Sequence, residues 1–417
     1  MQSTTKVYML VVIASLGYFV DIYDLVLFNV VKKESLEWLG LSGETLRQYD
    51  ISLFNWQMTG MLLGGLIWGI MGDKRGRIQV LFGSIILYSL ANIANAFVTG
   101  TQSYALCRIL AGIGLAGELG SGVTLVVESL DKHNRGWGTM IIVTFGALGG
   151  VAARLVGGSG GDIANFFGLN YQPWQMAYIV GGVLGIILLA LRIGAFESGM
   201  FTSMKESTVQ RGNFFQLFKT KERAYKYIAS VAIGLPIWFV VGVLINQSHT
   251  IAKFVGVAGD VKVGDSVMWS YVGLSVGDLI SGAMSQILRS RKKVILFYLA
   301  LLAVTVTVYL FNHDVSLEWF HFMCFMLGAS TGFWALFVTV ASEQFGTNLR
   351  STVTNTVPNF VRGATVPITN SFNALIPMMG AGLAAFTVGG ACIGLSLVAT
   401  LFVKETFSKE LNYYEAD

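Results

Sequence analysis

The stretch YFVDIYDLVLF, Tyr18 to Phe28, is an almost wholly apolar run that carries two aspartates. Asp21 and Asp24 are three residues apart, so their side chains lie on the same face of a helix. The run belongs to a longer apolar segment, residues 7–31. A helix needs about 20 mostly apolar residues to cross a bilayer, and this segment is long enough. The stretch therefore predicts a membrane helix with two carboxylates on one face, and charge in such a place usually has a function.

The composition of the whole chain also indicates a lipid environment. Of the 417 residues, 54% are hydrophobic and only 12% are charged, whereas a soluble domain carries about 25% charged residues. The mean hydropathy is +0.63. Cys107, Cys324 and Cys392 all lie in apolar runs without metal-ligand spacing, so we expect three core residues and no metal site. The N-terminus leads directly into an apolar segment of spanning length, which we interpret as the first span and not as a cleavable signal peptide.

Twelve apolar segments are long enough to cross the bilayer as helices. They predict an all-α integral membrane protein with spans at residues 7–31, 50–71, 79–98, 102–127, 137–158, 174–195, 227–250, 266–288, 294–311, 318–341, 352–376 and 381–403.

Basic residues are divided unevenly between the two sides of this bundle. If the N-terminus is cytoplasmic, 20 Lys and Arg residues fall inside, and five fall outside: Lys32, Lys33, Arg47, Lys253 and Lys262. Three more lie within spans: Arg108, Arg154 and Arg362. Cytoplasmic loops of membrane proteins carry the excess of basic residues. We therefore expect both termini to be cytoplasmic in an inner or plasma membrane.

The chain divides into two related parts. A polar and basic stretch, residues 196–226, predicts a cytoplasmic linker between two six-helix halves, residues 1–195 and 227–417. Glu128 and Arg135 are seven residues apart, and Glu343 and Arg350 repeat this spacing 215 residues later. Two parallel six-helix halves are one known plan of secondary transporters.

The loop GIMGDKRGR, Gly69 to Arg77, resembles the signature loop between spans two and three of the major facilitator superfamily. That signature is Gly, three residues, Asp, a basic residue, any residue, Gly, Arg and usually another basic residue, whose place Ile78 takes here. The segment CRILAGIGLAGELGSGVTLVVESLDKHNRG is similar to span four of the sugar-porter and metabolite–proton symporter branches. LRIGAFESGMF and SEQFGTNLRST resemble further elements of these branches. The resemblance covers nearly the whole chain and implies a secondary transporter, not an enzyme, without a cofactor.

The same resemblance implies a gate on the inner side. Gly76 permits a sharp turn in the signature loop, and Asp73 can accept hydrogen bonds from a helix N-terminus or from a nearby arginine. The resemblance implies that this loop is a latch of the outward-facing state. The alternative is that its positive charges only keep the loop on the inner side of the membrane. We expect six residues to form the inner gate: Asp73, Arg77, Glu128, Arg135, Glu343 and Arg350.

Charges inside the spans are the candidates for proton coupling and substrate binding, because each costs at least about 2.5 kcal/mol on insertion scales. Asp21 or Asp24 could load and release a proton, since burial and a nearby like charge favour the neutral carboxylic acid over the charged carboxylate. The symporter branch has a similar acidic-aromatic-Asp run in span one, which favours Asp24. The alternative is a structural pair in which each aspartate bonds an arginine or a backbone amide.

Two arginines occupy corresponding spans of the two halves. Arg154 in span five and Arg362 in span eleven could clamp a carboxylate or phosphate, because guanidinium groups bind such anions bidentately. Alternatively, each neutralises a buried acid. Further candidates are Asp278, which could instead pack against an arginine, and Glu118, which could be a second proton site or pair with Arg108. Asn246 and Gln247 could hydrogen-bond a ligand at the end of span seven.

These patterns together predict a proton-coupled symporter that imports a small organic anion, such as a carboxylate metabolite, by alternating access. The first rival is a proton-coupled antiporter that exports drugs or organic cations, but span five lacks the Gly-Pro of the antiporter signature. The second rival is a membrane enzyme or receptor, but no catalytic set stands out. We expect a monomer that contacts the lipid bilayer, a small-molecule substrate and a coupling ion, and no nucleic acid.

Overall fold

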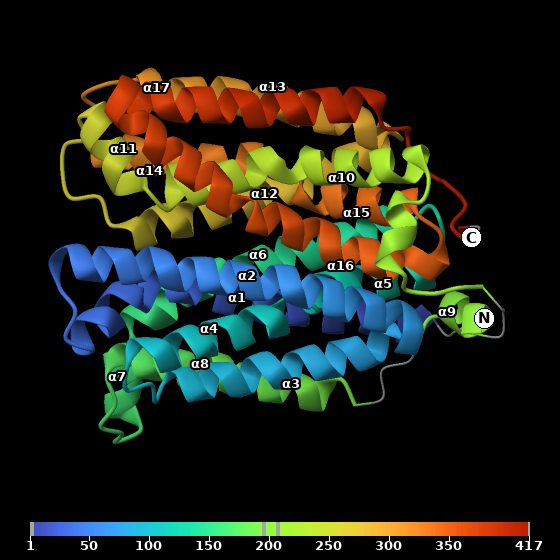
Figure 1. The fold of residues 1–417 in the computed structure, drawn as a ribbon, viewed down its shortest axis with the longest axis horizontal. Helices are drawn as coiled ribbons and strands as arrows, with labels where there is room; N and C mark the ends of the chain where they lie inside the picture. Colours follow the sequence, from blue (N-terminus) through green and yellow to red (C-terminus); the bar gives the residue numbers. More distant parts are fainter. Residues whose placement is uncertain (1–3, 194–196, 206–208, 416–417) are drawn as a thin grey trace.

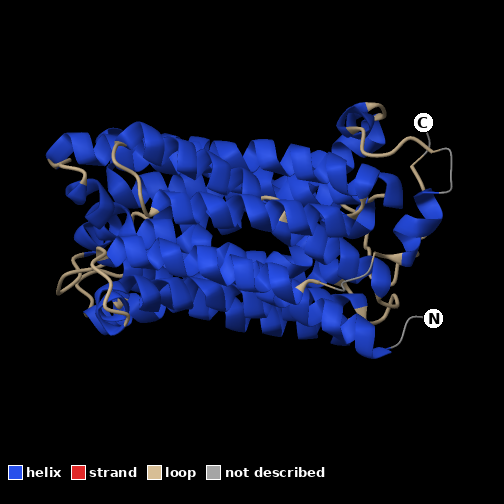
Figure 2. Cartoon of the chain, turned by 90° about the horizontal axis from the view of Figure 1, so that it is seen from below, coloured by secondary structure: helices blue, strands red, loops and turns tan. Residues whose placement is uncertain are grey.

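The computed structural model describes residues 4–193, 197–205 and 209–415. Its helices run along the long axis of a bundle, and both chain ends lie at the same end of it (Figures 1 and 2). We call this the terminal end. The described residues form the helices α1 (Thr4–Trp38), α2 (Gly43–Arg75), α3 (Arg77–Asn95), α4 (Thr101–Leu115), α5 (Glu118–Ser129), α6 (Arg135–Gly158), α7 (Gly160–Phe166), α8 (Pro173–Leu191), α9 (Gly199–Lys205), η1 (Phe214–Phe218), α10 (Lys221–Phe239), η2 (Val240–Ile245), α11 (Ser248–Val255), α12 (Val263–Ile287), α13 (Arg291–Phe311), α14 (Leu317–Ser330), α15 (Trp334–Gln344), α16 (Thr347–Gly363) and α17 (Thr365–Phe402).

Two groups of helices lie one above the other in Figure 1. The blue to green helices α1 to α8 form the N-terminal group, and the yellow to red helices α10 to α17 form the C-terminal group. The predicted boundary between two halves, at residues 195 and 196, lies outside the described residues. The division into two six-helix halves stays a prediction.

The all-α membrane fold is confirmed. Nine helical stretches of the described residues are long and apolar enough to cross a membrane. The last of them, residues 347–402, contains Gly380 in a non-helical conformation (φ 78°, ψ 163°), which divides it into two. α2 and α12 have 33 and 25 residues, which is also long enough to cross. The number of twelve spans stays a prediction.

Two of the predicted spans are interrupted in the middle. α4 passes into α5 through Ala116 and Gly117, and α14 passes into α15 through residues 331–333. Gly332 is needed there because an added Cβ would lie 2.3 Å from the Cα of Gly277. At Gly117, an added Cβ would lie 2.7 Å from the Cβ of Ser84. Both interruptions put the start of a new helix inside the bundle, where its first N–H groups need partners.

Glycines also bring the two helix groups into close contact. A Cβ on Gly69 of α2 would lie 2.9 Å from the Cα of Thr352 on α16, and one on Gly150 of α6 would lie 2.6 Å from Tyr271 of α12. Gly76 has a φ of 118° between α2 and α3, as expected for the sharp turn of the signature loop. The contacts of α2 with α16 and of α6 with α12 position the site described next.

Candidate functional site

The centre of the bundle holds the buried guanidinium of Arg362. The residue lies on α16 and is 1% exposed. Its Nη2 lies 3.4 Å from Oδ2 of Asp21 on α1, and its Cζ lies 5.8 Å from the ring centroids of Trp238 and of Trp334. The aspartate belongs to the N-terminal group and the other three residues to the C-terminal group, so the cluster joins the two groups.

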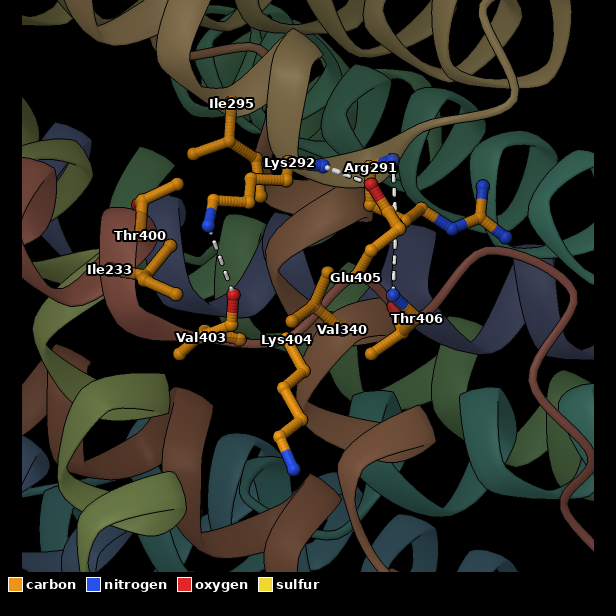
Figure 3. A pocket seen from close by; sticks show the side chains of 10 residues that line it. All are labelled: Ile233, Arg291, Lys292, Ile295, Val340, Thr400, Val403, Lys404, Glu405 and Thr406. Carbon is orange, nitrogen blue, oxygen red and sulfur yellow. Dashed lines mark hydrogen bonds between the residues drawn. The ribbon is translucent and has the colours of Figure 1, made fainter.

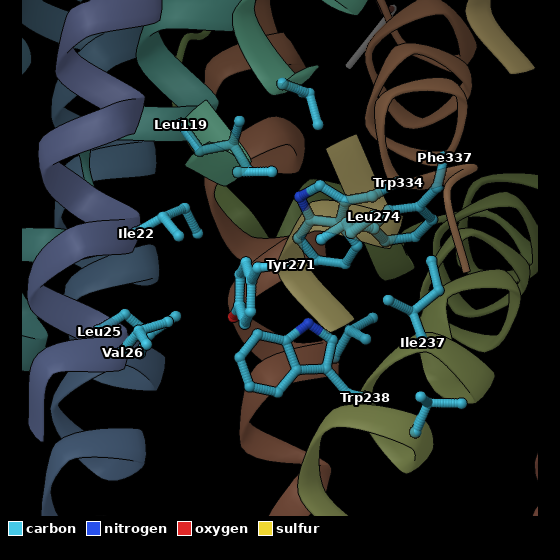
Figure 4. Packing of buried hydrophobic residues seen from close by; sticks show 14 of the residues in the cluster. Ile22, Leu25, Val26, Leu119, Ile237, Trp238, Tyr271, Leu274, Trp334 and Phe337 are labelled. Carbon is cyan, nitrogen blue, oxygen red and sulfur yellow. The ribbon is translucent and has the colours of Figure 1, made fainter. Parts of the chain in front are cut away.

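Aromatic and aliphatic side chains surround this guanidinium. The two indole rings meet at 6.4 Å between centroids, with planes 60° apart. Nε1 of Trp334 donates to the hydroxyl of Tyr18 on α1 at 2.8 Å, so a second bond crosses between the groups. Figure 4 shows more of the buried apolar residues that pack here: Ile22, Leu25, Val26, Leu119, Tyr271 and Leu274. The region combines one cation with a largely aromatic and apolar surround.

Asp24 belongs to a second cluster, inside the N-terminal group. It is 1% exposed, and among the described residues neither of its oxygens makes a hydrogen bond of normal geometry. Arg108 on α4 is fully buried and donates to Asn95 at 3.2 Å and to Asn92 at 3.0 Å. Its guanidinium lies 4.9 Å from the ring centroid of Tyr178. Within the described residues, no ion pair within 4 Å links Asp24 to Arg108.

Glu118 has a different partner from the one expected. It begins α5, and its two oxygens accept from Nη1 and Nη2 of Arg192 at 2.9 and 2.6 Å. Ser84 donates to the same carboxylate at 2.9 Å. The predicted alternative of a Glu118–Arg108 pair is wrong. Arg192 is 1% exposed, so this arginine is part of the buried bundle and not of a solvated loop.

Arg154 does not join the Arg362 cluster. It lies near the end of α6 that is distant from the termini, and its Nη2 is 2.8 Å from Asp265 at the start of α12. Both side chains are 27% exposed. The structure therefore does not form the two-arginine clamp of the sequence hypothesis, because a short ion pair across the groups already engages Arg154.

Asn246 and Gln247 are half-buried at the junction of η2 and α11. Within the described residues, neither hydrogen-bonds to Arg362 or to Asp21. Asp278 on α12 is fully buried and accepts from the backbone N–H of Ala335 at 2.9 Å. It makes no ion pair within the described ranges, so the predicted packing against an arginine is not formed. No three His, Cys, Asp or Glu side chains of these ranges form a metal-binding group.

The terminal end holds the residues of the predicted gate. Asp73, at the end of α2, is fully buried. Its Oδ1 accepts from the backbone N–H of Ser351 at 3.0 Å, and its Oδ2 accepts from the N–H and the hydroxyl of Thr352 at 2.8 and 2.7 Å. Nη2 of Arg77 lies 3.5 Å from Oδ1 of Asp73. One carboxylate of the N-terminal group thus holds α16 of the C-terminal group by three hydrogen bonds.

Glu128 is the centre of an ion network beside this contact. Its Oε1 lies 2.8 Å from Arg77 of its own group and 2.9 Å from Arg350 of the other group. Ser198 donates to Oε2 at 2.5 Å. Both arginines are fully buried, so these pairs are protected from solvent screening. The network therefore links the two helix groups at the terminal end.

Glu343 and Arg135 are the remaining two of the six predicted gate residues. Nη2 of Arg291 on α13 lies 3.4 Å from Oε1 of Glu343. Arg135 donates to the backbone carbonyls of Val127 and Lys409 at 3.1 and 2.9 Å. The structure thus places all six predicted gate residues at the terminal end, and it adds Arg291, which sequence reasoning had assigned to a loop.

An acid follows the last helix of each group and caps another helix of the same group, α3 in the N-terminal group and α13 in the C-terminal group. Glu197 accepts from the N–H of Ile78 in α3 at 3.1 Å. Glu405 accepts from the N–H of Arg291 in α13 at 3.1 Å, beside a small pocket that Figure 3 shows. Burial opposes the charge of Glu405, but donors from Ser290 and from backbone N–H groups hold its pKa below the ordinary value. The matching caps extend the internal repeat that the sequence indicated.

The segment 404–415 lies against residues of the predicted gate and is a feature that sequence reasoning missed. Leu411 is fully buried, and its carbonyl accepts from Nη2 of Arg350 at 2.7 Å. The carbonyl of Lys409 accepts from Arg135 of the N-terminal group. The carbonyl of Tyr413 accepts from the N–H of Thr347 at 2.9 Å. The segment therefore binds gate residues of both groups through its main chain, for which side-chain patterns give no signal.

Removal of residues 408–417 should loosen the closed terminal end, because Arg135 and Arg350 lose main-chain acceptors and hydrogen bonds to charged groups contribute about 1.5–3 kcal/mol each. A thiol in place of Ser121, which is buried beside Asn355, reports opening. Maleimide should label it roughly tenfold faster in the shortened protein, the change that 1.4 kcal/mol produces in an equilibrium constant. Asn412→Ala is the control because this side chain is exposed and its replacement keeps the main-chain acceptors of the segment. Equal labelling of shortened and full-length protein would contradict the role of the segment.

Comparisons with known proteins agree with this architecture. A family model described as the Major Facilitator Superfamily matches residues 14–357. The "Probable 4-methylmuconolactone transporter" of Cupriavidus pinatubonensis is 26% identical over 346 residues, which covers 76% of this chain and 77% of that protein. The 3-(3-hydroxy-phenyl)propionate transporter of Escherichia coli is 28% identical over 256 residues, which covers 60% and 59%.

A solved structure has the same fold. It is that of the proton:xylose symporter XylE bound to 6-bromo-6-deoxy-D-glucose, with a TM-score of 0.76 and 15% sequence identity. The match covers 98% of each chain. With the family match over most of its length, the chain belongs to the Major Facilitator Superfamily and is a membrane transport protein, not an enzyme.

Proposed function

We propose that the protein imports a small organic monocarboxylate together with a proton. The observation that carries this proposal is the position of Arg362, beside two indole rings and beside Asp21, where the two helix groups meet. Alternating access requires a site that both groups share. A carboxylate on the substrate and a guanidinium in a poorly hydrated site form strong charge-assisted hydrogen bonds.

The contact between Arg362 and Asp21 leaves room for competition. Its distance of 3.4 Å is longer than the 2.7–2.9 Å of a strong charge-assisted hydrogen bond. Oδ1 of Asp21 and Nε of Arg362 have no hydrogen-bond partner among the described residues. A proton on Asp21 removes the negative charge that competes with the substrate for Arg362. Proton and anion then bind together, and release of the proton returns Asp21 to the guanidinium and displaces the anion.

The surround of Arg362 favours a substrate with an aromatic or apolar body. Trp238 and Trp334 offer flat faces, and buried apolar side chains such as Leu25, Val26 and Leu274 pack in the same region. A sugar carries several hydroxyl groups, and the two indole faces offer no hydrogen-bond partner to them, which is costly in a buried site. One of the relatives is named for an aromatic carboxylate, 3-(3-hydroxy-phenyl)propionate. The rival substrate, an organic cation exported in exchange for protons, would meet the positive charge of Arg362.

The terminal end is the gate of this cycle. The bonds of Asp73, Glu128 and Arg350 hold it closed, and they must break when the site opens to that side. We infer that this end is cytoplasmic, because 20 Lys and Arg residues are predicted on the side of the termini and only five on the opposite side. Asp24, Glu118, Asn246 and Gln247 stay candidates for proton transfer or substrate contact, and Arg154 is better assigned to a latch at the opposite end.

Uptake into proteoliposomes tests the proposal. With an alkaline interior, the native protein should accumulate labelled benzoate, and a proton ionophore should abolish accumulation. Asp21→Asn should lower accumulation at least tenfold, because amides do not titrate, while counterflow of benzoate survives. Asp24→Asn is the matched variant three residues away. Loss of accumulation only in Asp24→Asn would assign the proton to Asp24. Absence of benzoate uptake by the native protein would overturn the proposed function.

A further inference from the structure

Asp278 acts on the backbone of another helix. The carboxylate belongs to α12 and is fully buried. Its Oδ1 accepts from the N–H of Ala335, the second residue of α15, at 2.9 Å. Its Oδ2 has no hydrogen-bond partner among the described residues. Because no ion pair engages Asp278 in the described ranges, its defined contact is with the first turn of α15.

The start of α15 needs such a partner. The helix begins inside the bundle after the interruption at residues 331–333, and its N-cap residue, Phe333, supplies no side-chain hydrogen bond. The first four N–H groups of a helix have no partner within the helix, and its N-terminus attracts negative charge. Gly277 and Gly332 allow the two backbones to approach closely, since a Cβ on Gly332 would lie 2.3 Å from the Cα of Gly277 and one on Gly277 would lie 2.9 Å from the Cα of Gly332. This contact brings the carboxylate of the next residue, Asp278, to the helix start.

The residue that this cap fixes is Trp334, the first residue of α15. Its Nε1 bonds Tyr18 of the N-terminal group at 2.8 Å, and its ring lies 5.8 Å from the guanidinium of Arg362. Phe337, one turn later, packs against the same indole at 4.9 Å between centroids. A shift of the first turn of α15 would therefore move the indole relative to Arg362 and break its bond across the two groups.

We propose that Asp278 is a positioning residue: it holds the start of α15 so that Trp334 lies over Arg362, and it thereby sets the affinity of the central site for its anion. The part on affinity rests on the proposed function, in which Arg362 binds a carboxylate. The part on position does not, because it concerns the indole ring in the protein alone. This role differs from that of a coupling residue, which carries the transported proton and whose replacement by an amide stops accumulation under a pH gradient.

The position of the indole can be measured without any ligand. In protein labelled with 5-fluorotryptophan, Trp334→Phe identifies the 19F resonance of Trp334. Asp278→Leu should move or broaden that resonance, because leucine offers no acceptor to α15. Asp278→Asn, which keeps an amide oxygen, should leave it in place. Ser281→Ala on the same helix is the matched control, since its hydroxyl donates to the backbone carbonyl of Asp278 and not to its carboxylate or to α15. An unchanged resonance in Asp278→Leu would overturn the proposal.

Binding of benzoate to purified protein tests the effect on affinity. Asp278→Leu should raise Kd about tenfold, the effect of 1.4 kcal/mol, and Asp278→Asn should stay within about threefold of the native value. In the Trp334→Phe background the leucine variant should add little, because residues that act through one another are not additive. If Asp278→Leu fails to fold, Asp278→Ala replaces it.

Two outcomes separate the possible failures. If Asp278→Asn binds benzoate normally but no longer accumulates it under a pH gradient, and Asp278→Leu leaves the 19F resonance of Trp334 unchanged, Asp278 carries the proton and the positioning role is wrong. If the native protein binds no organic anion, the proposed function fails, and the 19F resonance still decides whether Asp278 positions Trp334.

Discussion

Replacement of Arg362 by alanine should weaken benzoate binding by a factor of about 100 or more, since loss of one partner of a buried hydrogen-bonded charge pair costs about 2–5 kcal/mol. Transport should then fall to background. Lysine should not restore binding, because a compact ammonium lacks the planar fork that both binds a carboxylate and stacks on the indole rings. Isothermal titration of the native protein and of Arg362→Ala and Arg362→Lys measures the effect.

Two further variants make this test specific. Arg154→Ala removes the other predicted clamp arginine, whose partly exposed pair with Asp265 contributes at most about 1 kcal/mol, and its Kd should stay within about fivefold of the native value. Asp21→Asn/Arg362→Ala removes both charges of the central pair, so a loss of binding there cannot come from an unpaired aspartate. Native affinity in Arg362→Ala would show that the anion binds elsewhere.

Replacement of Asp73 by asparagine should lower the maximal rate of transport at least tenfold. The amide loses the charge and cannot accept all three hydrogen bonds from Ser351 and Thr352. Charged hydrogen bonds contribute about 1.5–3 kcal/mol each, so the closed state of the terminal end loses at least one factor of ten in population. The protein should then rest with this end open and complete its cycle slowly.

The rate of labelling at Ser121→Cys should rise with this change, while the affinity for benzoate changes less, because Asp73 does not contact Arg362. Asp131→Asn is a suitable control, since this aspartate is exposed at the same end of the bundle. Transport by Asp73→Asn at the native rate would contradict the role of Asp73 as a latch.

The sequence by itself determined the class of the protein and indicated the residues of the predicted gate. Apolar segments of spanning length and a charged fraction of 12% leave lipid as the only suitable environment. The signature loop, with Asp73, Gly76 and Arg77, was readable because a sharp turn and a conspicuous charge pattern are local properties. Glu128 and Arg135 have the same spacing as Glu343 and Arg350. This repeat is also a local property, and it indicated that the four residues lie at one end of the bundle.

Only the tertiary structure decided which charges meet. Arg154 and Arg362 occupy corresponding spans, but one lies at an end of the bundle beside Asp265 and the other at its centre beside Asp21. Glu118 pairs with Arg192 of the sixth predicted span and not with Arg108. Spacing along the chain fixes the face of a helix, but partners depend on the depth of each residue, the rotation of each helix and the interruptions at Gly117 and Gly332.

The segment 404–415 and the cap of α15 show a second limit of the sequence. Leu411 and Lys409 bind the gate through carbonyl oxygens, which every residue possesses, so no side-chain pattern marks them. Asp278 was recognisable as a buried charge, but its partner is the N–H of Ala335, and this N–H is free only because the helix is interrupted there. Main-chain donors and acceptors become specific through the fold alone, which is why the structure was needed to find them.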